Sequence, residues 1–190
     1  MIHSISAAIR KAGIEDVKSI MKIEYASFHS GIVESEKTFE DRMKTFGDGF
    51  LVAEIETNGE KIIVGYISSE LWKYSKEIPY ENFTLNHSVC ETHKKDGNEL
   101  YISSVAIDPA VRGKNIGRQL FEELLKTVSE KYKLKSSILI VNRDWRSAFE
   151  MYRKNGFEII AEIPNFFPEN EEEDSRKITQ RNGIIMRRMF

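Results

Sequence analysis

A basic turn lies between an apolar segment and a predicted helix near the middle of the chain. Residues 105–118 read V-A-I-D-P-A-V-R-G-K-N-I-G-R, so the apolar segment ends at Asp108 and the helix begins after the turn. The first amides of a helix have no intrahelical partner and carry the positive end of the helix dipole. These amides, with the charges of Arg112, Lys114 and Arg118, predict a site for a phosphate group.

The same turn resembles the signature of the GNAT superfamily of acetyl-CoA-dependent N-acetyltransferases, Arg/Gln-x-x-Gly-x-Gly/Ala between a strand and a helix. Arg112 and Gly117 match its ends, and Asn115 takes the place of its middle glycine. Asn is the next most tolerant residue for left-handed backbone. The resemblance implies that acetyl-CoA is the co-substrate, with its pantetheine arm along the preceding strand and its pyrophosphate on the turn. The implied cofactor-binding residues are Val105, Ala106, Ile107, Arg112, Gly113, Lys114, Asn115, Ile116, Gly117 and Arg118.

A second block, residues 138–157, is similar to a strand, helix and closing strand of the same family. It reads I-L-I-V-N-R-D-W-R-S-A-F-E-M-Y-R-K-N-G-F, with Ala148 and Tyr152 at the family's spacing. By this resemblance Tyr152 is the general acid that protonates the departing CoA thiolate, and the alternative is that Tyr152 only packs on an amphipathic helix. Trp145 stands where the family often has an Asn that contacts the cofactor, and Asn142 at the strand end is the expected substitute.

Acetyl transfer to an amine also needs a base, because an alkylammonium has a reference pKa of about 10.4 and must lose a proton before it attacks. Glu99, at the start of the strand before the turn, is the predicted base, acting directly or through water. Glu24 in the first predicted helix is a second candidate, and either side chain could instead be a surface carboxylate. Tyr101 and Ser103 alternate onto the same face as Glu99, so these three side chains are expected to line the amine channel.

Other segments resemble the arylalkylamine N-acetyltransferase branch of the superfamily. They are I-E-Y-A-S-F at 23–28, I-V-G-Y-I-S-S-E-L-W at 63–72 and F-T-L-N-H-S at 83–88. That branch relays the amine proton through two histidines on the central strand, and Tyr101 and Ser103 occupy the matching positions here. His87 and His93 in the preceding segment are not assigned to this role, because a loop histidine is more often solvated than catalytic.

The predicted function is acetyl-CoA-dependent transfer of an acetyl group to a primary amine, directly within a ternary complex. A small (aryl)alkylamine or a polyamine is the expected acceptor. The alternatives are acetylation of a protein N-terminus or lysine and, in another class, a CoA-binding sensor without catalysis. The acidic run at 169–174 could attract a cationic amine, although such runs are commonly solvated loops.

Composition favours one enzyme domain over residues 1–190. With 28 basic and 30 acidic residues the net charge is -2, so neither nucleic acid nor an anionic membrane is an expected partner. No apolar run approaches the roughly 20 residues of a membrane span, and the N-terminus lacks the pattern of a signal peptide. The single cysteine, Cys90, fits a reducing compartment, and we expect a cytoplasmic monomer or homodimer. The histidines have no metal-binding spacing, so no metal is expected.

The order of predicted elements indicates an α/β (α+β) fold with a central mixed, mostly antiparallel sheet flanked by helices. The resemblance adds that the fourth and fifth strands splay apart. Predicted strands cover 6–10, 50–56, 61–72, 99–107, 136–141, 157–163 and 178–189, and predicted helices cover 14–28, 36–46 and 145–155. A further helix has its apolar stripe from Ile116 to Val128. Asn58-Gly59 predicts a hairpin turn, and 74–98 is expected to form a long loop or short helix over the active site.

Overall fold

The computed structural model describes residues 6–168 and 181–190. The strands are β1 Ala8–Lys11, β2 Phe50–Thr57, β3 Glu60–Trp72, β4 Glu99–Ile107, β5 Ser136–Asn142, β6 Glu158–Ile163 and β7 Gly183–Met189. The α-helices are α1 Val17–Ser27, α2 Glu36–Phe46, α3 Val89–Thr92, α4 Ile116–Lys131 and α5 Arg146–Lys154. Short 3-10 helices are η1 Ile14–Asp16, η2 Gly47–Gly49, η3 Tyr80–Asn82 and η4 Pro109–Val111.

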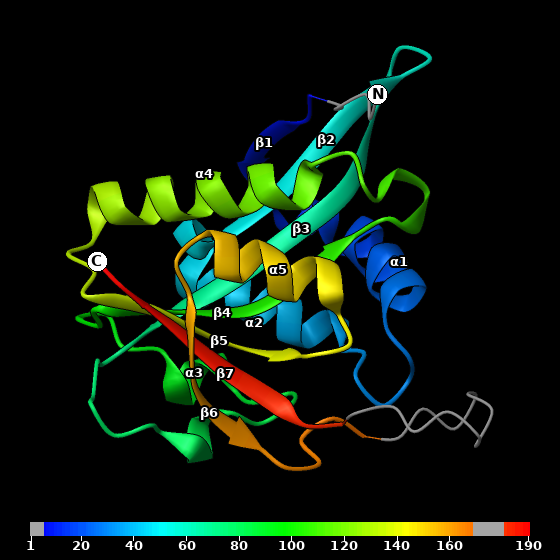
Figure 1. The fold of residues 1–190 in the computed structure, drawn as a ribbon. Coiled ribbons are helices and arrows are strands. Elements are labelled where there is room, and N and C mark those ends of the chain that lie inside the picture. Colours follow the sequence, from blue (N-terminus) through cyan, green and yellow to red (C-terminus); the bar gives the residue numbers. More distant parts are fainter. Residues whose placement is uncertain (1–5, 169–180) are drawn as a thin grey trace, which may run out of the picture.

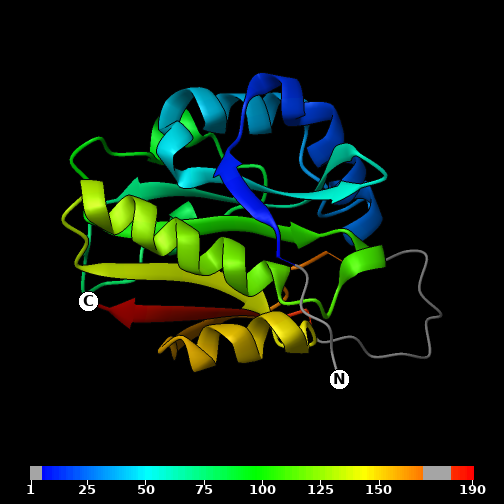
Figure 2. The ribbon, with the colours of Figure 1, turned by 90° about the horizontal axis from the view of Figure 1, so that it is seen from above.

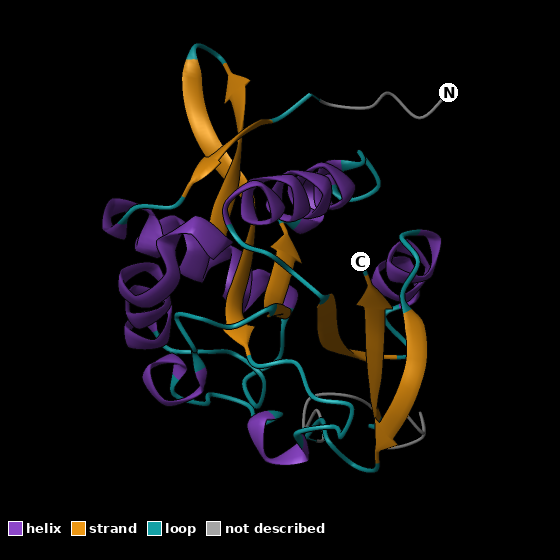
Figure 3. Ribbon diagram, turned by 90° about the vertical axis from the view of Figure 1, so that its left-hand side faces the viewer, coloured by secondary structure: helices purple, strands orange, loops and turns teal. Residues whose placement is uncertain are grey.

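A sheet of seven strands in the order β1-β2-β3-β4-β5-β7-β6 forms the centre of the molecule (Figure 1). Neighbouring strands are antiparallel except β4 and β5, which are parallel. The pairing of β4 with β5 covers only Glu99–Ile102 and its partners at 136–139, although both strands continue further. The two strands therefore separate after Ile102, as Figure 3 shows from the side. The predicted mixed sheet with splayed fourth and fifth strands is confirmed.

Helices cover both faces of the sheet (Figure 2). On one face α1 and α2 pack over an apolar cluster that includes Phe39, Phe50 and Tyr66. On the other face lie α4, over β2 to β4, and α5, beside β5. The predicted stripe of α4 faces the sheet, and Leu120 and Phe121 at its centre are fully buried. None of the helices in the described part of the chain is both long and apolar enough to cross a membrane.

Local signals set most element ends. Asn58 and Gly59 have φ angles of 53° and 80°, which give the predicted tight turn between β2 and β3. Gly156, with φ 81°, follows α5 as the predicted cap. The first helix begins with a 3-10 turn before Val17, because the carboxylate of Asp16 accepts the Gly13 amide at 2.8 Å and holds the chain in a tight turn.

The start of the last strand differs from the prediction, because β7 begins at Gly183 and not at 178. Residues 178–180 lie outside the described ranges, as does the acidic run 169–174. The predicted antiparallel pairing of the last two strands is confirmed, since β6 pairs with β7 along its length.

The segment 74–98 is mostly irregular and is fixed to the sheet through Glu70 of β3. His87 Nε2 lies 2.6 Å from one carboxylate oxygen of Glu70, and the hydroxyl of Thr92 donates to the other at 2.7 Å. The His87 side chain is only 8% exposed, so the expectation of a solvated loop histidine is wrong. The physical reason is the burial of Glu70, whose carboxylate needs donors once it is removed from water.

Candidate active site

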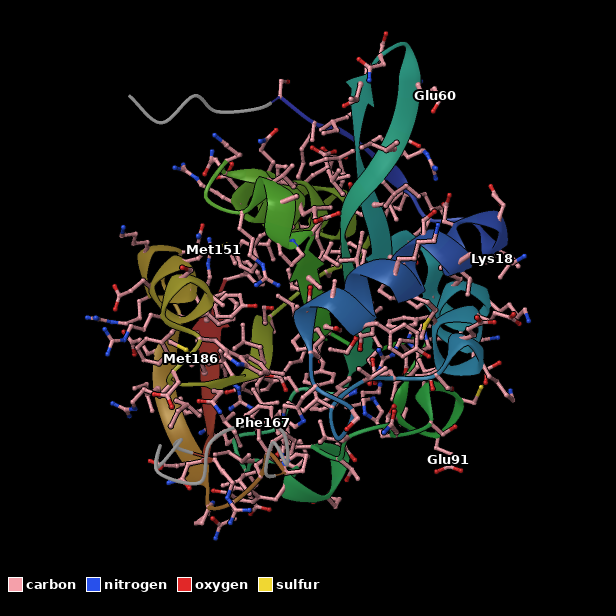
Figure 4. The ribbon with its side chains drawn as sticks, turned by 90° about the vertical axis from the view of Figure 1, so that its right-hand side faces the viewer. Lys18, Glu60, Glu91, Met151, Phe167 and Met186 are labelled. Carbon is pink, nitrogen blue, oxygen red and sulfur yellow. The ribbon has the colours of Figure 1, made fainter. Side chains whose placement is uncertain are left out.

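A cavity of about 90 Å³ lies where β4 and β5 separate. It is lined from both sides of the splay, from the end of α1, from the segment 74–98 and from the residues before β7. The lining residues are Glu24, Phe28, Ile32, Glu34, Arg42, Thr84, Leu85, His87, Tyr101, Ile102, Ser103, Ser104, Val105, Ile140, Val141, Trp145, Ala148, Tyr152, Phe166 and Phe167. Figure 4 labels Phe167, which lies between the part that carries α5 and the part that carries α1.

The free edge of β4 offers backbone groups to this cavity. The amide of Asp108 donates to Val64 of β3 at 2.9 Å, so the alternate residues Ile107 and Val105 direct their backbone groups toward the splay. The carbonyl of Ile107 accepts from Nε of Arg112 at 3.0 Å. The side chain of Ala106 points into the core beneath α1 and α2. Of the predicted residues on this strand, Val105 lines the cavity.

The turn before α4 has the backbone that its sequence predicted. Gly113 and Asn115 both have left-handed φ angles, 77° and 70°, which confirms the expectation that Asn115 substitutes for a glycine. The side chain of Asn115 makes no capping bond to the first helix amides, which leaves that end of α4 without a side-chain acceptor. A side chain at Gly117 would come within 3.6 Å of Ile107, an ordinary contact distance.

Three other side chains of the turn differ in how far they are free to contact a ligand. Arg112 donates through Nη2 to the hydroxyl of Ser27 at 3.0 Å, in addition to its bond to β4. Arg118 pairs with Glu122 at 2.6 Å on the helix surface. Ile116 is 1% exposed and packs in the core, so only its backbone can face a ligand.

Tyr152 reaches the cavity from α5. It packs against the rings of Phe121 and Phe157, with centroid separations of 5.7 Å and 5.9 Å. Burial raises the pKa of the Tyr152 phenol well above its ordinary value, because the charged form would lose its hydration. The phenol therefore stays protonated and can serve as a hydrogen-bond donor in the cavity.

Glu24 reaches the same cavity from α1. It is 1% exposed, accepts the amide of Glu34 at 3.1 Å and accepts the hydroxyl of Tyr66. The pKa of Glu24 is raised to about 7, because the effect of burial is only partly offset by the bond from Tyr66 and the charge of Arg42. A buried carboxylate with a pKa near neutrality can take up a proton from a ligand.

The structure does not bring Glu99 to the cavity. Glu99 sits where β4 and β5 are still paired, is fully buried, and forms an ion pair with Arg187 of β7 at 2.8 Å. Its carboxylate also accepts the hydroxyl of Ser136 at 2.7 Å. Tyr101 and Ser103, which the sequence grouped with Glu99, do line the cavity. The ring of Tyr101 stacks on Trp72 with a centroid separation of 4.0 Å.

Two groups of cavity residues were not predicted from the sequence as site residues. A buried ion pair joins Arg42 of α2 to Glu34, and Arg42 Nη1 lies 3.5 Å from the Ser68 hydroxyl. The second of these groups is His87, and nothing in the local sequence distinguishes it from a surface histidine. Its two ring nitrogens lie 2.9 Å from the Thr84 carbonyl and 2.6 Å from the Glu70 carboxylate, so both are directed at partners within the protein.

The end of β5 presents Trp145 to the cavity and not Asn142. Asn142 is not among the cavity residues, and its side-chain oxygen accepts the amide of Asp144 at 2.9 Å, which fixes the turn into α5. Trp145 lines the cavity instead, with its ring against Phe28 and Phe167. Across residues 6–168 and 181–190, no three His, Cys, Asp or Glu side chains are grouped as metal ligands would be.

Residues 15–157 match the family model described as the acetyltransferase (GNAT) family. An N-alpha-acetyltransferase from Sulfurisphaera tokodaii is 26% identical over 167 residues, which cover 86% of this chain and 87% of the relative.

Solved structures share the fold at low identity. The loading GNATL domain of CurA from Lyngbya majuscula has a TM-score of 0.75 at 15% identity, covering 97% of this chain and 98% of that one. Naa50 from Arabidopsis thaliana, in complex with the bisubstrate analogue CoA-Ac-MVNAL, has a TM-score of 0.67 at 20% identity, covering 98% of this chain and 100% of the other. These likenesses concern the fold.

Proposed function

The chain belongs to the GNAT family of acetyltransferases and is an acetyl-CoA-dependent N-acetyltransferase, and we propose that its acceptor is a small primary amine with an apolar body. The observation that carries the proposal is the two-sided lining of the cavity in the splay. Toward α1 and α2 the lining contains the polar side chains Glu24, Glu34 and Arg42, beside the ring of Phe28 at the end of α1. Toward α5 and β7 it is apolar and contains Trp145 and Phe167. An amine with an apolar body matches both sides, because its ammonium meets the polar side chains and its body meets the rings.

Glu24 acts as the base in this proposal. An alkylammonium with a pKa of about 10.4 must give up a proton, and the pKa of Glu24, raised from 4.5 to about 7, narrows the gap that the proton must cross. By the usual conversion, the rise makes the transfer easier by about 3 kcal/mol than transfer to an ordinary glutamate. Glu99, the base predicted from the sequence, has no catalytic role in this proposal, because Arg187 holds its carboxylate outside the cavity.

Tyr152 acts at the other end of the reaction. The neutral amine attacks the thioester carbonyl, the C–N bond forms, and the C–S bond breaks with its electron pair on sulfur. The proton left on the new amide nitrogen and the negative charge on sulfur must then be neutralised. The phenol of Tyr152, kept protonated by burial, donates its proton to the sulfur as the thiolate leaves, and the phenolate takes the extra proton from the new amide nitrogen, so that Tyr152 ends neutral. Direct transfer in a ternary complex needs no covalent intermediate on the protein.

The cofactor in this proposal lies on the splay and on the turn before α4. The backbone of Val105 and the amide of Ile107 would pair with the amide groups of the pantetheine arm, and the N-terminal amides of α4 would bind the pyrophosphate. Gly113, Lys114, Asn115 and Gly117 form the surface of that turn. Residues 1–190 are proposed to act as one domain, since both helical layers pack on one sheet.

A second candidate acceptor is the N-terminus of a protein. The similarity to an N-alpha-acetyltransferase over 86% of this chain favours it. A peptide acceptor would need room beyond the cavity of about 90 Å³, whereas a compact amine would need less. This difference is why we place the small amine first.

The test is incubation of the protein with acetyl-CoA and matched acceptors, followed by mass measurement of the products. The panel contains 2-phenylethylamine, its aliphatic analogue butylamine, the polyamine spermidine, peptides with a free N-terminus and peptides blocked there but carrying lysine. We expect the largest kcat/KM for the arylalkylamine, and loss of activity in Glu24→Gln. Acetylation of free N-terminal peptides alone would replace the first candidate with the second. CoA binding without transfer to any acceptor would leave only the sensor.

A further inference from the structure

We infer that Ser104 of β4 and Tyr66 of β3 form a proton relay that carries the acceptor's proton to Glu24. The inference rests on the proposed function, because it names the path by which the amine is deprotonated in the same cavity. Ser104 lines the cavity and is partly exposed, although it lies on a central strand. The exposure arises because the splay leaves that stretch of β4 without a partner strand.

The hydrogen-bond directions of the relay follow from the donors available. Tyr66 is fully buried and has one hydroxyl proton, which it donates to the carboxylate of Glu24. The hydroxyls of Tyr66 and Ser104 are 3.0 Å apart, and Tyr66 has no second proton to give, so Ser104 must be the donor. The lone pairs of Ser104 then remain available to accept a proton from an ammonium in the cavity.

The alternative is direct transfer from the amine to Glu24, and the surroundings of Glu24 disfavour it. Each carboxylate oxygen already accepts a bond, one from Tyr66 and the other from the amide of Glu34. The charged and titratable groups that face Glu24 are Tyr66 from β3, Glu34 from the loop before α2, and Arg42 from α2. Arg42 donates to Glu34 through both terminal nitrogens, and its guanidinium has no lone pair that could accept the proton of the amine.

The step balances without an external reactant. One N–H bond of the ammonium breaks and its proton passes to the Ser104 oxygen. The Ser104 proton passes to the Tyr66 oxygen, and the Tyr66 proton passes to Glu24. Neither hydroxyl is left charged, the amine becomes neutral, and Glu24 becomes a neutral carboxylic acid. Release of that proton to solvent and rotation of the two hydroxyls restore the starting arrangement.

The experiment compares Ser104→Ala, Ser104→Thr and Tyr66→Phe with wild type on the best acceptor of the panel. Ser104→Ala should lower kcat by about 100-fold, the usual size of a general acid–base effect, with unchanged affinity for acetyl-CoA. The remaining activity of Ser104→Ala should rise with pH as the ammonium of the acceptor loses its proton in solution. It should not follow the pH range in which Glu24 loses its proton. Ser104→Thr keeps a hydroxyl and should retain most of the activity, and Tyr66→Phe should behave as Ser104→Ala does.

The matched control is Ser69→Ala. Ser69 is buried in the neighbouring bulge of β3 and donates to the Gly49 carbonyl at 2.8 Å, but it does not line the cavity. The Ser69→Ala variant should be slightly less stable than wild type and should keep the kcat and the pH profile of wild type. Wild-type kcat and pH profile in Ser104→Ala would overturn the relay while the proposed function stands. An inactive wild type on every amine would overturn both.

Discussion

The ring of Trp145 lies 5.6 Å from the ring of Phe28, centroid to centroid, and this contact bridges the two halves of the splayed sheet. Phe28 directly follows α1, whereas Trp145 directly precedes α5. The indole also lies 4.9 Å from the ring of Phe167, before β7. The three rings, which we call the aromatic bridge, form the apolar side of the cavity in which the acceptor is proposed to bind.

Removal of the central ring of the aromatic bridge should change acceptor selection. Trp145→Ala is expected to raise KM for 2-phenylethylamine by about tenfold, because it removes one aromatic contact and much apolar area. KM for butylamine should change less, and Trp145→Phe should lie close to wild type. Steady-state kinetics with both amines measure the ratio. An equal loss for the two amines would remove the bridge from acceptor selection.

Tyr152→Phe should lower kcat by at least about tenfold, because the departing thiolate loses its donor. The ring contacts with Phe121 and Phe157 persist in this variant, so thermal stability and affinity for CoA should remain near wild type. Calorimetric titration with CoA and steady-state kinetics separate the two quantities. Unchanged turnover across the pH range would leave Tyr152 with a packing role only.

Gly117→Ala should stabilise the fold and weaken CoA binding. The new methyl group meets Ile107 at an ordinary 3.6 Å, and alanine is favoured over glycine within a helix by roughly 0.5–1 kcal/mol. The same methyl group would stand where the proposed pyrophosphate meets the helix amides, and Gly117→Val enlarges the obstruction. Thermal unfolding and calorimetry with CoA test the two effects together. Unaltered CoA affinity in both variants would move the phosphate site elsewhere.

Ionisation of Glu24 should cost stability in the pH range where it enables activity. Its pKa is about 7 in the folded protein against an ordinary 4.5, so the folded state favours the protonated form. The stabilising contribution is fully present below pH 4.5 and is lost as the pH rises through 7. Relative to Glu24→Gln, which stays neutral, wild type should lose about 3 kcal/mol of unfolding free energy over this range.

Urea titrations of both proteins at several pH values measure that difference. Over the same range kcat/KM of wild type should increase, because Glu24 must be ionised to accept a proton. A constant stability difference between the two proteins would mean that Glu24 titrates as an ordinary glutamate.

Glu99→Gln should act on stability and not on the chemical step. Replacement of the carboxylate leaves the buried guanidinium of Arg187 without its counter-charge, which typically costs about 3–5 kcal/mol. The double variant Glu99→Gln with Arg187→Met should recover part of that loss. Thermal unfolding compares the variants, and kcat per folded molecule should stay close to wild type. A large fall in kcat with full stability would return Glu99 to the role that the sequence predicted.

The sequence by itself determined the elements and the backbone of the turns. Asn58, Asn115 and Gly156 adopt positive φ angles where their types predicted them, and the apolar periodicity of α4 identified its buried face. These features depend on residues a few positions apart, and the rules of local backbone conformation and periodicity apply at that range. The resemblance of the 105–118 segment to one family agreed with the match of the family model.

Only the tertiary structure distinguished between Glu24 and Glu99. In the sequence each is a glutamate within an apolar element, but Arg187, from the last strand, neutralises Glu99, while Tyr66 and the splay adjoin Glu24. The aromatic bridge and the bond between His87 and Glu70 likewise join residues far apart in the chain. A side chain's pKa and its access to a cavity are set by what surrounds it in space, and that environment exists only after the chain has folded.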